Sequence, residues 1–367
     1  MKKSAGIITL CTVSAALICS LSFGIYQTHN RQVPSYRTEG KTSETSEEWF
    51  TDSVADENFD FGLNEEWIDL NDLEYKVTDK LKTYLFIGTD HSGNENATDE
   101  TYQGSMADFL LVAILNQTNH TYGFLQLNRD TITEVMVLDS NGEPVSSYDG
   151  QICTSHWYGA SKQQSCLNTV DAVSGLLGDL TVNGYYSIGM DEIAKLNHVI
   201  GGATVTIEDD FSRVDPSLVM GETITLTDEQ AYNYLHARMD VGDGENESRM
   251  RRQRTYMEAV YDKVIDRVKS EKNFLKDITD SLGDSVTTSM NGDDFGQIRE
   301  TFQDGKDLGI HIPEGETTVG SRLDDGLEHT EFYVNEASLA DIMVQLCNLK
   351  IDEFTDWNDL EAETEIW

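Results

Sequence analysis

The sequence predicts a three-layer α/β/α fold, with a central mixed sheet and helices on both of its faces. Two segments, Tyr84–Asp90 and Phe109–Asn116, are almost continuous apolar runs, which are typical of strands buried on both faces. Between residues 165 and 210, helix-like and strand-like segments alternate, as they do when helices pack on both sides of a sheet. We expect a single N-terminal transmembrane helix to precede this fold.

Residues 1–27 predict that helix, in the form of a signal anchor. Lys2 and Lys3 come before an uncharged run from Ser4 to Tyr26, which is long enough to cross the hydrocarbon core of a membrane. No clear small-residue cleavage site follows the run, although a cleaved signal peptide is the alternative. Because basic residues tend to stay in the cytoplasm, we expect a single-pass protein of the cell membrane whose C-terminal domain is extracytoplasmic.

The remainder of the chain is expected to form a stalk, one domain and a tail. Residues 28–76 are acidic and rich in Ser, Thr and Asn, which predicts a flexible stalk. The segment 64–77, at the end of the stalk, is expected to dock on the domain as a short helix. Residues 77–350 are expected to be the extracytoplasmic domain, and residues 351–367 an acidic C-terminal tail.

The further elements of the domain follow in chain order. Tyr122–Val135 reads as a third strand that ends in polar residues, and residues 165–180 read as a helix capped near Ser165. The next segments indicate, in order, a strand at 181–190, a helix at 191–202, a strand at 204–210 and, at the end, a strand and helix over 331–349. Thr227 and Gln230 have the spacing of a capping box, which predicts a helix to about Arg238, and Ser248 is the expected N-cap of the next helix.

Five arginines lie within Ala231–Arg254, in a chain whose formal net charge is −40. A guanidinium group donates two parallel hydrogen bonds to phosphate oxygens, so the cluster predicts a phosphate site. Arg249, Arg252 and Gln253 share one face in the first turn of a helix, where free N–H groups also favour an anion. The alternative is a solvated helix face whose arginines pair with the local carboxylates Asp240, Asp243, Glu245 and Glu247.

Acidic residues stand at the ends of the three predicted strands. Asp90 follows the first strand, Asp108 precedes the second, and Arg129 and Asp130 lie on the third. Carboxylate oxygens are the ligands that Mg²⁺ prefers, and Mg²⁺ often accompanies phosphates. Polar residues are also common at strand ends, so each position taken alone has an ordinary structural explanation.

The remaining sequence signals mostly exclude functions. There is no phosphate-binding loop, zinc-protease, serine-hydrolase or CxxC motif, and the strong acidity argues against nucleic-acid binding. Cys153 and Cys166 either form a disulfide outside the cell or remain buried free thiols. We also expect an apolar tunnel between the sheet and its helices, lined partly by the Leu176–Leu177 helix and the Met250–Val260 helix.

Five short motifs, taken together, resemble the LytR–CpsA–Psr family. In this sequence they are Gly88-Thr89-Asp90, Met106-Ala107-Asp108, Asn128-Arg129-Asp130-Thr131, His236-Ala237-Arg238 and Arg249-Met250-Arg251-Arg252-Gln253. The resemblance covers about Lys82 to Asp266. It implies an α/β/α domain with a tunnel for a polyprenyl chain. It also implies transfer of a glycan phosphate, such as a teichoic acid or capsule precursor, from a polyprenyl-pyrophosphate carrier to cell-wall peptidoglycan.

The resemblance also implies roles for individual residues. Asp90 and Asp108 would hold Mg²⁺, and Asp130 would either orient Arg129 or act as a base toward the acceptor hydroxyl. The expected pyrophosphate-binding residues are Arg129, Arg238, Arg249, Arg252, Gln253 and, when protonated, His236. A pyrophosphatase side activity is a secondary expectation. We further expect Arg129, Arg238 and Arg252 to converge on one anion site, with Asp90 and Asp108 facing it across the Mg²⁺.

Two departures from the family pattern weaken the expectation of catalysis. Met106 and His236 stand where the family usually has arginine, and Asn128 replaces the usual proline before Arg129. A long insertion between Asp90 and Met106 adds Asp99 and Glu100 near the expected metal site. The alternative to a transferase is therefore a non-catalytic protein that binds polyprenyl-pyrophosphate-linked glycan and acts as a scaffold or regulator of envelope assembly.

Overall fold

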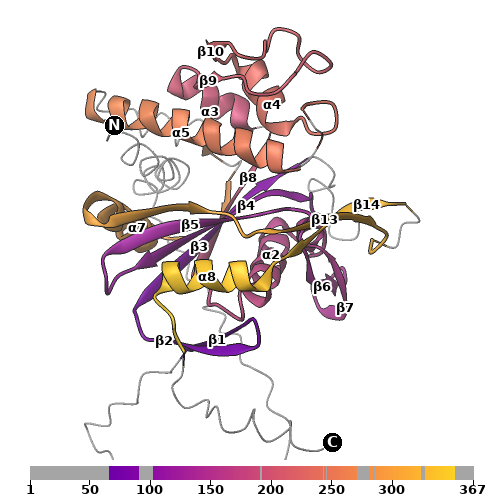
Figure 1. Ribbon diagram of the computed structural model, residues 1–367, viewed down its shortest axis with the longest axis vertical. Coiled ribbons are helices and arrows are strands. Elements are labelled where there is room, and N and C mark those ends of the chain that lie inside the picture. Colours follow the sequence, from indigo (N-terminus) through magenta and orange to yellow (C-terminus); the bar gives the residue numbers. More distant parts are fainter. Residues whose placement is uncertain are drawn as a thin grey trace, which may run out of the picture.

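The computed structural model shows a sheet-based body with a smaller lobe stacked on one side of it (Figure 1). It describes residues 66–90, 102–190, 192–242, 244, 246–270, 282–283, 286–323 and 327–351. Several predicted features lie outside this part of the chain. They are the expected anchor at residues 1–27, the stalk up to residue 65, Asp99, Glu100 and the tail from residue 352. Among the residues described, no helix is both long enough and apolar enough to span a membrane.

The body is built on a six-stranded mixed sheet, as the sequence predicts. Its strand order is β11-β8-β3-β4-β5-β12. The pairs β3/β8 and β5/β12 are parallel, and the other neighbours are antiparallel. The strands are β3 (Leu81–Thr89), β4 (Ala107–Asn116), β5 (Thr121–Leu127), β8 (Gly184–Gly189), β11 (Val286–Thr288) and β12 (Lys306–His311).

Helices cover both faces of this sheet. The central strand β4 requires this cover, because it is apolar at every position from Leu110 to Leu115. Its even-numbered residues belong to the core under α2 (Lys162–Leu176) and α8 (Glu336–Cys347). The odd-numbered residues belong to a second core on the opposite face, which includes Ile298 of α7 (Gly292–Asp304). This alternation follows from the two-residue period of a strand, and it gives the predicted three layers.

The smaller lobe has a hydrophobic core of its own. It contains α3 (Glu192–Ile200), the hairpin of β9 (Thr204–Thr206) and β10 (Thr223–Thr225), α4 (Asp228–His236) and α5 (Asn246–Ser270). Phe211, Tyr234 and Val260 are among the residues of this core. The predicted capping box is confirmed, because Thr227 and Gln230 bond reciprocally at the start of α4. The lobe lies at the top of Figure 1, with α5 directly above the sheet.

The prediction of a helix over residues 64–77 was wrong. Residues 66–77 form a hairpin of β1 (Glu66–Leu70) and β2 (Leu73–Val77), which pairs with β15 (Lys350–Ile351). Asn71 and Asp72 both have positive φ, as the two central residues of a type I′ hairpin turn require. Ile68 and Leu70 alternate with exposed positions and enter the main core, so the end of the expected stalk belongs to the folded body.

The strand expected over Tyr122–Val135 is two strands, β5 and β6 (Ile132–Leu138), because the chain turns after β5. The side chain of Asn128 accepts a hydrogen bond from the Asp130 N–H at 3.0 Å, an Asx turn that ends the strand. β6 pairs with β7 (Pro144–Gln151), which leads into the 3₁₀ helix η2 (Ile152–Trp157). A separate hairpin, β13 (Gly315–Gly320) with β14 (His329–Val334), lies beside them.

Two expected helix caps needed correction, and the structure decides between the two alternatives for Cys153 and Cys166. The N-cap of α2 is Ser161, which accepts from Gln164 N–H, and not Ser165. Helix α5 begins at Asn246, so Ser248 lies inside it. Cys153 and Cys166 are buried free thiols with different partners, since Cys166 contacts His156 at 3.6 Å whereas Cys153 accepts from Arg129. The predicted tunnel stays a prediction.

Candidate functional site

The strand register brings the predicted acidic residues to one edge of the sheet. Thr89 at the end of β3 pairs with Ala107 at the start of β4, and Leu110 near that start pairs with Leu127 at the end of β5. Asp90, Asp108 and the Arg129–Asp130 pair therefore follow or begin neighbouring strands at the same edge. The N-terminus of α5 lies over this edge, because Arg249 contacts Asp108.

Asp108 is shared by two arginines. One of its carboxylate oxygens accepts from Arg129, and the other accepts from Arg249 at 2.8 Å. Arg249 also donates to the backbone carbonyl of Asp108 at 3.3 Å. Burial acts to raise the pKa of Asp108, but the charges of Arg129 and Arg249 hold it below its ordinary value. Asp108 is therefore a buried carboxylate that stays ionised at neutral pH.

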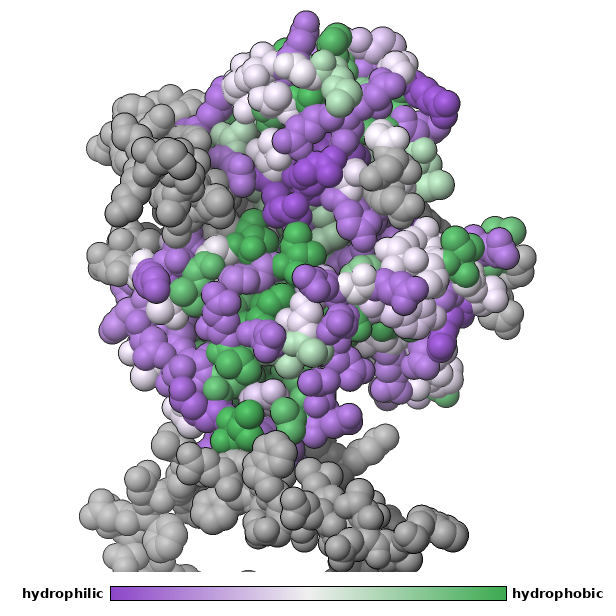
Figure 2. Space-filling model, in the orientation of Figure 1, coloured by the Kyte–Doolittle hydropathy of each residue, from purple (hydrophilic) through white to green (hydrophobic). Residues whose placement is uncertain are grey.

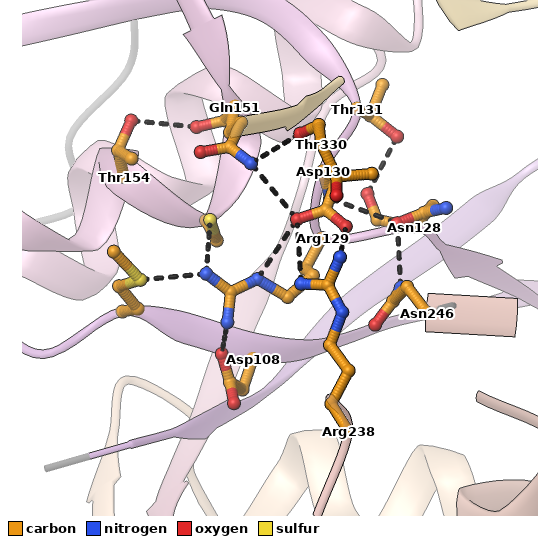
Figure 3. A network of polar contacts seen from close by, with 12 residues as sticks. Asp108, Asn128, Arg129, Asp130, Thr131, Gln151, Thr154, Arg238, Asn246 and Thr330 are labelled. Carbon is orange, nitrogen blue, oxygen red and sulfur yellow. Dashed lines mark hydrogen bonds and ion pairs between the residues drawn. The ribbon is translucent and has the colours of Figure 1, made fainter. Parts of the chain in front are cut away.

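Asp130 is the second shared carboxylate, and it is fully buried. Arg238 reaches it with both terminal nitrogens, at 2.8 and 3.4 Å, and the Nε of Arg129 lies 3.4 Å away. Gln151 donates to the same carboxylate at 3.1 Å and to the Thr330 carbonyl of β14 at 2.7 Å. Figure 3 shows Arg129 and Arg238 meeting at Asp130, with Asp108 beyond Arg129.

A pair of asparagines ties the edge of the sheet to α5. Asn246 donates to the Asn128 side chain at 2.7 Å, and its own side-chain oxygen accepts from Arg249 at 2.8 Å. Asn128 also forms the Asx turn that places Asp130. The asparagine that replaces the family's usual proline therefore positions both Asp130 and Arg249 through hydrogen bonds that proline lacks.

At this site three guanidinium groups contact only two carboxylates. The guanidinium groups are those of Arg129, Arg238 and Arg249, and the carboxylates are those of Asp108 and Asp130. Burial lowers the pKa of Arg249, Asp108 opposes this change, and the charges of Arg129 and Arg238 lower it further. The guanidinium groups of Arg129, Arg238 and Arg249 repel one another, and a bound anion would reduce this repulsion.

Several buried N–H donors at the site have no hydrogen-bond partner among the residues that the structure describes. They include the Nε groups of Arg238 and Arg249 and the side-chain amide nitrogen of Gln253. An unpaired buried polar group is costly, and all of these groups are donors. The site therefore has the chemistry to bind an oxyanion.

Arg252 does not belong to this site, which corrects the prediction that it converges with Arg129 and Arg238. Its guanidinium donates to Asp209 at 2.7 Å and to the carbonyls of Tyr234 and Ala237 near the end of α4. The group also lies over the Phe211 ring. Arg252 is fully buried within the smaller lobe, where it joins α5 to α4. Arg249 and Arg252 have i, i+3 spacing, but α5 packs against both the sheet and the lobe. Arg249 therefore contacts the sheet, whereas Arg252 contacts the lobe.

The other predicted residues lie at or near the edge. Asp90 accepts from the Met106 N–H at 2.8 Å and so joins β3 to the start of β4. His236 stacks on Tyr232, and its charge also lowers the pKa of Asp108. Gln253 accepts a long hydrogen bond from Gln126 of β5, at 3.5 Å.

The carboxylates expected to hold Mg²⁺ contact other groups in this structure. Both oxygens of Asp108 accept from arginines, and no group of three metal-ligating side chains occurs in the part of the chain that the structure describes. Mg²⁺ at Asp90 and Asp108 stays a prediction.

Sequence patterns did not identify Cys153 or Gln151 as site residues, and they marked Met106 only as a departure from the family's usual arginine. The sulfur atoms of Met106 and Cys153 both face its Nη2 nitrogen, at 2.7 and 3.1 Å. Burial raises the pKa of the Cys153 thiol to about 11, so it is a neutral partner. No local pattern marks Cys153 or Gln151, because both reach the site only through the β6–β7 hairpin.

Comparison with known proteins identifies the family. A model of the LytR_cpsA_psr family matches residues 38–346. The chain belongs to the LytR–CpsA–Psr family.

Named relatives of this LytR–CpsA–Psr protein are distant in sequence. A Halalkalibacterium halodurans protein called polyisoprenyl-teichoic acid–peptidoglycan teichoic acid transferase TagU is 25% identical over 213 residues, 57% of this chain and 62% of that protein. The match thus spans less than two thirds of that relative. A Bacillus cereus (strain AH820) protein of the same name is 23% identical over 264 residues, 71% of this chain and 77% of that one.

Solved structures show that the fold is shared. Protein gbs0355 of Streptococcus agalactiae aligns with a TM-score of 0.58 at 17% identity, over 78% of this chain and 96% of that one. At this identity the likeness concerns the arrangement of the chain, including the sheet and its covering helices.

Arg252→Ala should destabilise this LytR–CpsA–Psr protein by about 3–5 kcal/mol, because it removes a fully buried charge partner of Asp209. Urea unfolding of the full chain, followed by tryptophan fluorescence, measures the change. Arg251→Ala is the matched control, since Arg251 also contacts Asp209 but is well exposed. Equal unfolding midpoints for wild type and Arg252→Ala would show that the contacts of Arg252 do not hold the lobe together.

Asp108 should make stability depend on pH in the acid range. Since its folded pKa lies below its ordinary value, it stabilises the fold above that ordinary value, about 3.9. This stabilisation is lost as the pH falls through the folded value. We expect the free energy of unfolding to fall more steeply below about pH 4 in wild type than in Asp108→Asn. Asp149→Asn, at an exposed pair, is the control, and an identical slope in Asp108→Asn and wild type would contradict the assignment.

Proposed function

We propose that this protein is a membrane-anchored phosphotransferase. In this proposal it moves a glycan phosphate from a polyprenyl-pyrophosphate carrier to cell-wall peptidoglycan, at the outer side of the cell membrane. The observation that carries the proposal is the cluster of three buried guanidinium groups that share two carboxylates and keep unpaired N–H donors. The names of the TagU relatives describe a reaction of this class.

Charge stabilisation is the main catalytic demand of this reaction. An oxygen of the acceptor hydroxyl attacks the phosphorus that carries the glycan, the bond from that phosphorus to the bridging oxygen breaks, and polyprenyl phosphate leaves. Negative charge develops on the leaving phosphate, and the proton of the acceptor hydroxyl passes to that phosphate or to water. Fixed arginines stabilise such charge at no cost of reorganisation. Arg129, Arg238 and Arg249 are held in place by Asp108 and Asp130 before any substrate binds.

The geometry favours an orienting role for Asp130 over a role as base. The carboxylate is fully buried and accepts from Arg238, while Arg129 and Gln151 contact the same group. A general base must reach the proton that it removes, whereas these contacts surround the carboxylate. Asp130 therefore holds the guanidinium groups of Arg129 and Arg238 next to each other.

Apolar surface next to this site supports binding of the polyprenyl chain. The sheet face toward α7 is a buried core that includes Phe86, Tyr122 and Phe124. Figure 2 shows hydrophobic side chains gathered over the sheet below α5 and strongly hydrophilic side chains over α5 itself. A lipid with a charged headgroup has the same two-part character.

The alternative is a non-catalytic binder of the same lipid-linked glycan. It is favoured by Met106, because a thioether and the Cys153 thiol, both uncharged, are the partners of Arg129 Nη2. Release of polyprenyl phosphate from the donor by the full chain, with peptidoglycan and Mg²⁺ present, separates the two. Binding without turnover would select the scaffold role.

Arg129→Ala and Arg238→Ala should each weaken binding of a short polyprenyl pyrophosphate. Loss of one charge-assisted contact of about 1.5–3 kcal/mol corresponds to roughly 10- to 150-fold in affinity. Calorimetric titration of the full chain in detergent measures the affinity, and circular dichroism checks that each variant is folded. Arg213→Ala removes an exposed charge outside the site and should bind like wild type. Wild-type affinity in both site variants would remove the basis of the proposal.

A further inference from the structure

A buried glutamine of β5 organises a second set of donors beside the arginine cluster. Gln126 is almost fully buried and contacts two neighbouring residues of α5. Its side-chain oxygen accepts from Arg254 Nη1 at 3.0 Å, and its side-chain nitrogen donates to Gln253 at 3.5 Å. Glutamine is unusual on a strand whose other residues on that face, Tyr122 and Phe124, are apolar.

The orientation of these two amides follows from Arg254. An arginine only donates hydrogen bonds, so the oxygen of Gln126 must face Arg254 and its nitrogen must face Gln253. The contact at Gln253 therefore uses the oxygen of that side chain. Its amide nitrogen is left buried and without a hydrogen-bond partner. The network thus holds a donor ready for an acceptor from outside the chain.

Arg254 itself lacks a carboxylate partner among the residues that the structure describes. Arg251, one turn earlier on the same helix, forms ion pairs with Glu208 at 2.9 Å and with Asp209 at 2.6 Å. No ion pair of this kind occurs at Arg254 within the described part of the chain, although the guanidinium is half-buried and contacts Gln126. Burial lowers the pKa of Arg254, and the nearby charge of Glu258 only opposes this effect.

We propose that Arg254, positioned by Gln126 beside Gln253, extends the anion site of the arginine cluster to a second phosphate. Gln253 follows Arg249 by four residues, one turn of α5 and about 6 Å along its axis. The two sets of donors thus form a continuous row along the helix. This inference rests on the proposed function, because the second phosphate is that of the polyprenyl-pyrophosphate donor. Arg254 and Gln126 are the new members of the site.

The test compares a pyrophosphate with a monophosphate. Full chain in detergent is titrated with a short polyprenyl pyrophosphate and with the polyprenyl monophosphate of the same length. Arg254→Gln should weaken binding of the pyrophosphate about tenfold or more, as expected for one charge-assisted contact, and change the monophosphate less than twofold. Arg251→Gln, the same change one turn away, should alter neither affinity. Equal losses for both lipids, or no loss for either, would overturn this extension of the site.

Gln126→Glu tests whether Gln126 positions Arg254 and Gln253 for the ligand or only stabilises the fold. The new carboxylate would pair with Arg254 and no longer donate to Gln253, so the pyrophosphate affinity should fall to the level of Arg254→Gln. The melting temperature should stay the same or rise, because Arg254 gains an ion pair. A variant that keeps wild-type affinity would contradict the proposal.

Arg129→Ala distinguishes failure of this inference from failure of the proposed function. If Arg129→Ala weakens binding of both lipids while Arg254→Gln weakens neither, the proposed function stands and the extension of the site falls. If Arg129→Ala also leaves both affinities unchanged, the proposed function falls with it.

Discussion

The structure depends on two buried carboxylates that hold three arginines against their mutual repulsion. Asp108 joins Arg129 to Arg249, and Asp130 joins Arg129 to Arg238. Each arginine comes from a different element, namely the turn after β5, the turn after α4 and the first part of α5. The ion pairs therefore fix the smaller lobe over the edge of the sheet. Removing one of these arginines would leave a carboxylate with uncompensated charge in the interior of the protein. The five charged residues therefore depend on one another.

The same contacts keep the site ready for an anion. Two carboxylates are shared among three guanidinium groups, and several buried donors have no hydrogen-bond partner among the residues that the structure describes. Met106 and Cys153 add neutral sulfur contacts to Arg129, so they fill space around it without compensating its charge. Arg252, by contrast, is fully compensated by Asp209 and two carbonyls. The difference between a binding arginine and a structural one thus lies in its unsatisfied donors.

Much of the fold was predictable, because the spacing of apolar residues in the sequence indicates where strands and helices lie. The strands around Leu85, Leu111 and Phe124, the capping box at Thr227 and the mixed sheet all follow from local pattern. The β1–β2 hairpin was missed because its alternation is short and its turn, Asn71-Asp72, was read as part of an acidic stalk. Arg129, Arg238, Asp108 and Asp130 were identified from their places at strand and helix ends. Arg252 was misassigned, since helical spacing says which residues share a face but not which neighbour that face meets. Gln151 and Asn246 act through partners far away in the chain, so only the structure reveals them, and it also shows the contact of Arg254 with Gln126.

A crystal structure of the full chain grown with pyrophosphate would show whether the three arginines bind an anion. We expect the anion within hydrogen-bonding distance of Arg129, Arg238 and Arg249, with the unpaired Nε groups of Arg238 and Arg249 donating to it. Asp108 and Asp130 should keep their arginine contacts. Pyrophosphate bound elsewhere, with these three guanidinium groups contacting only carboxylates, would show that they do not form an anion site.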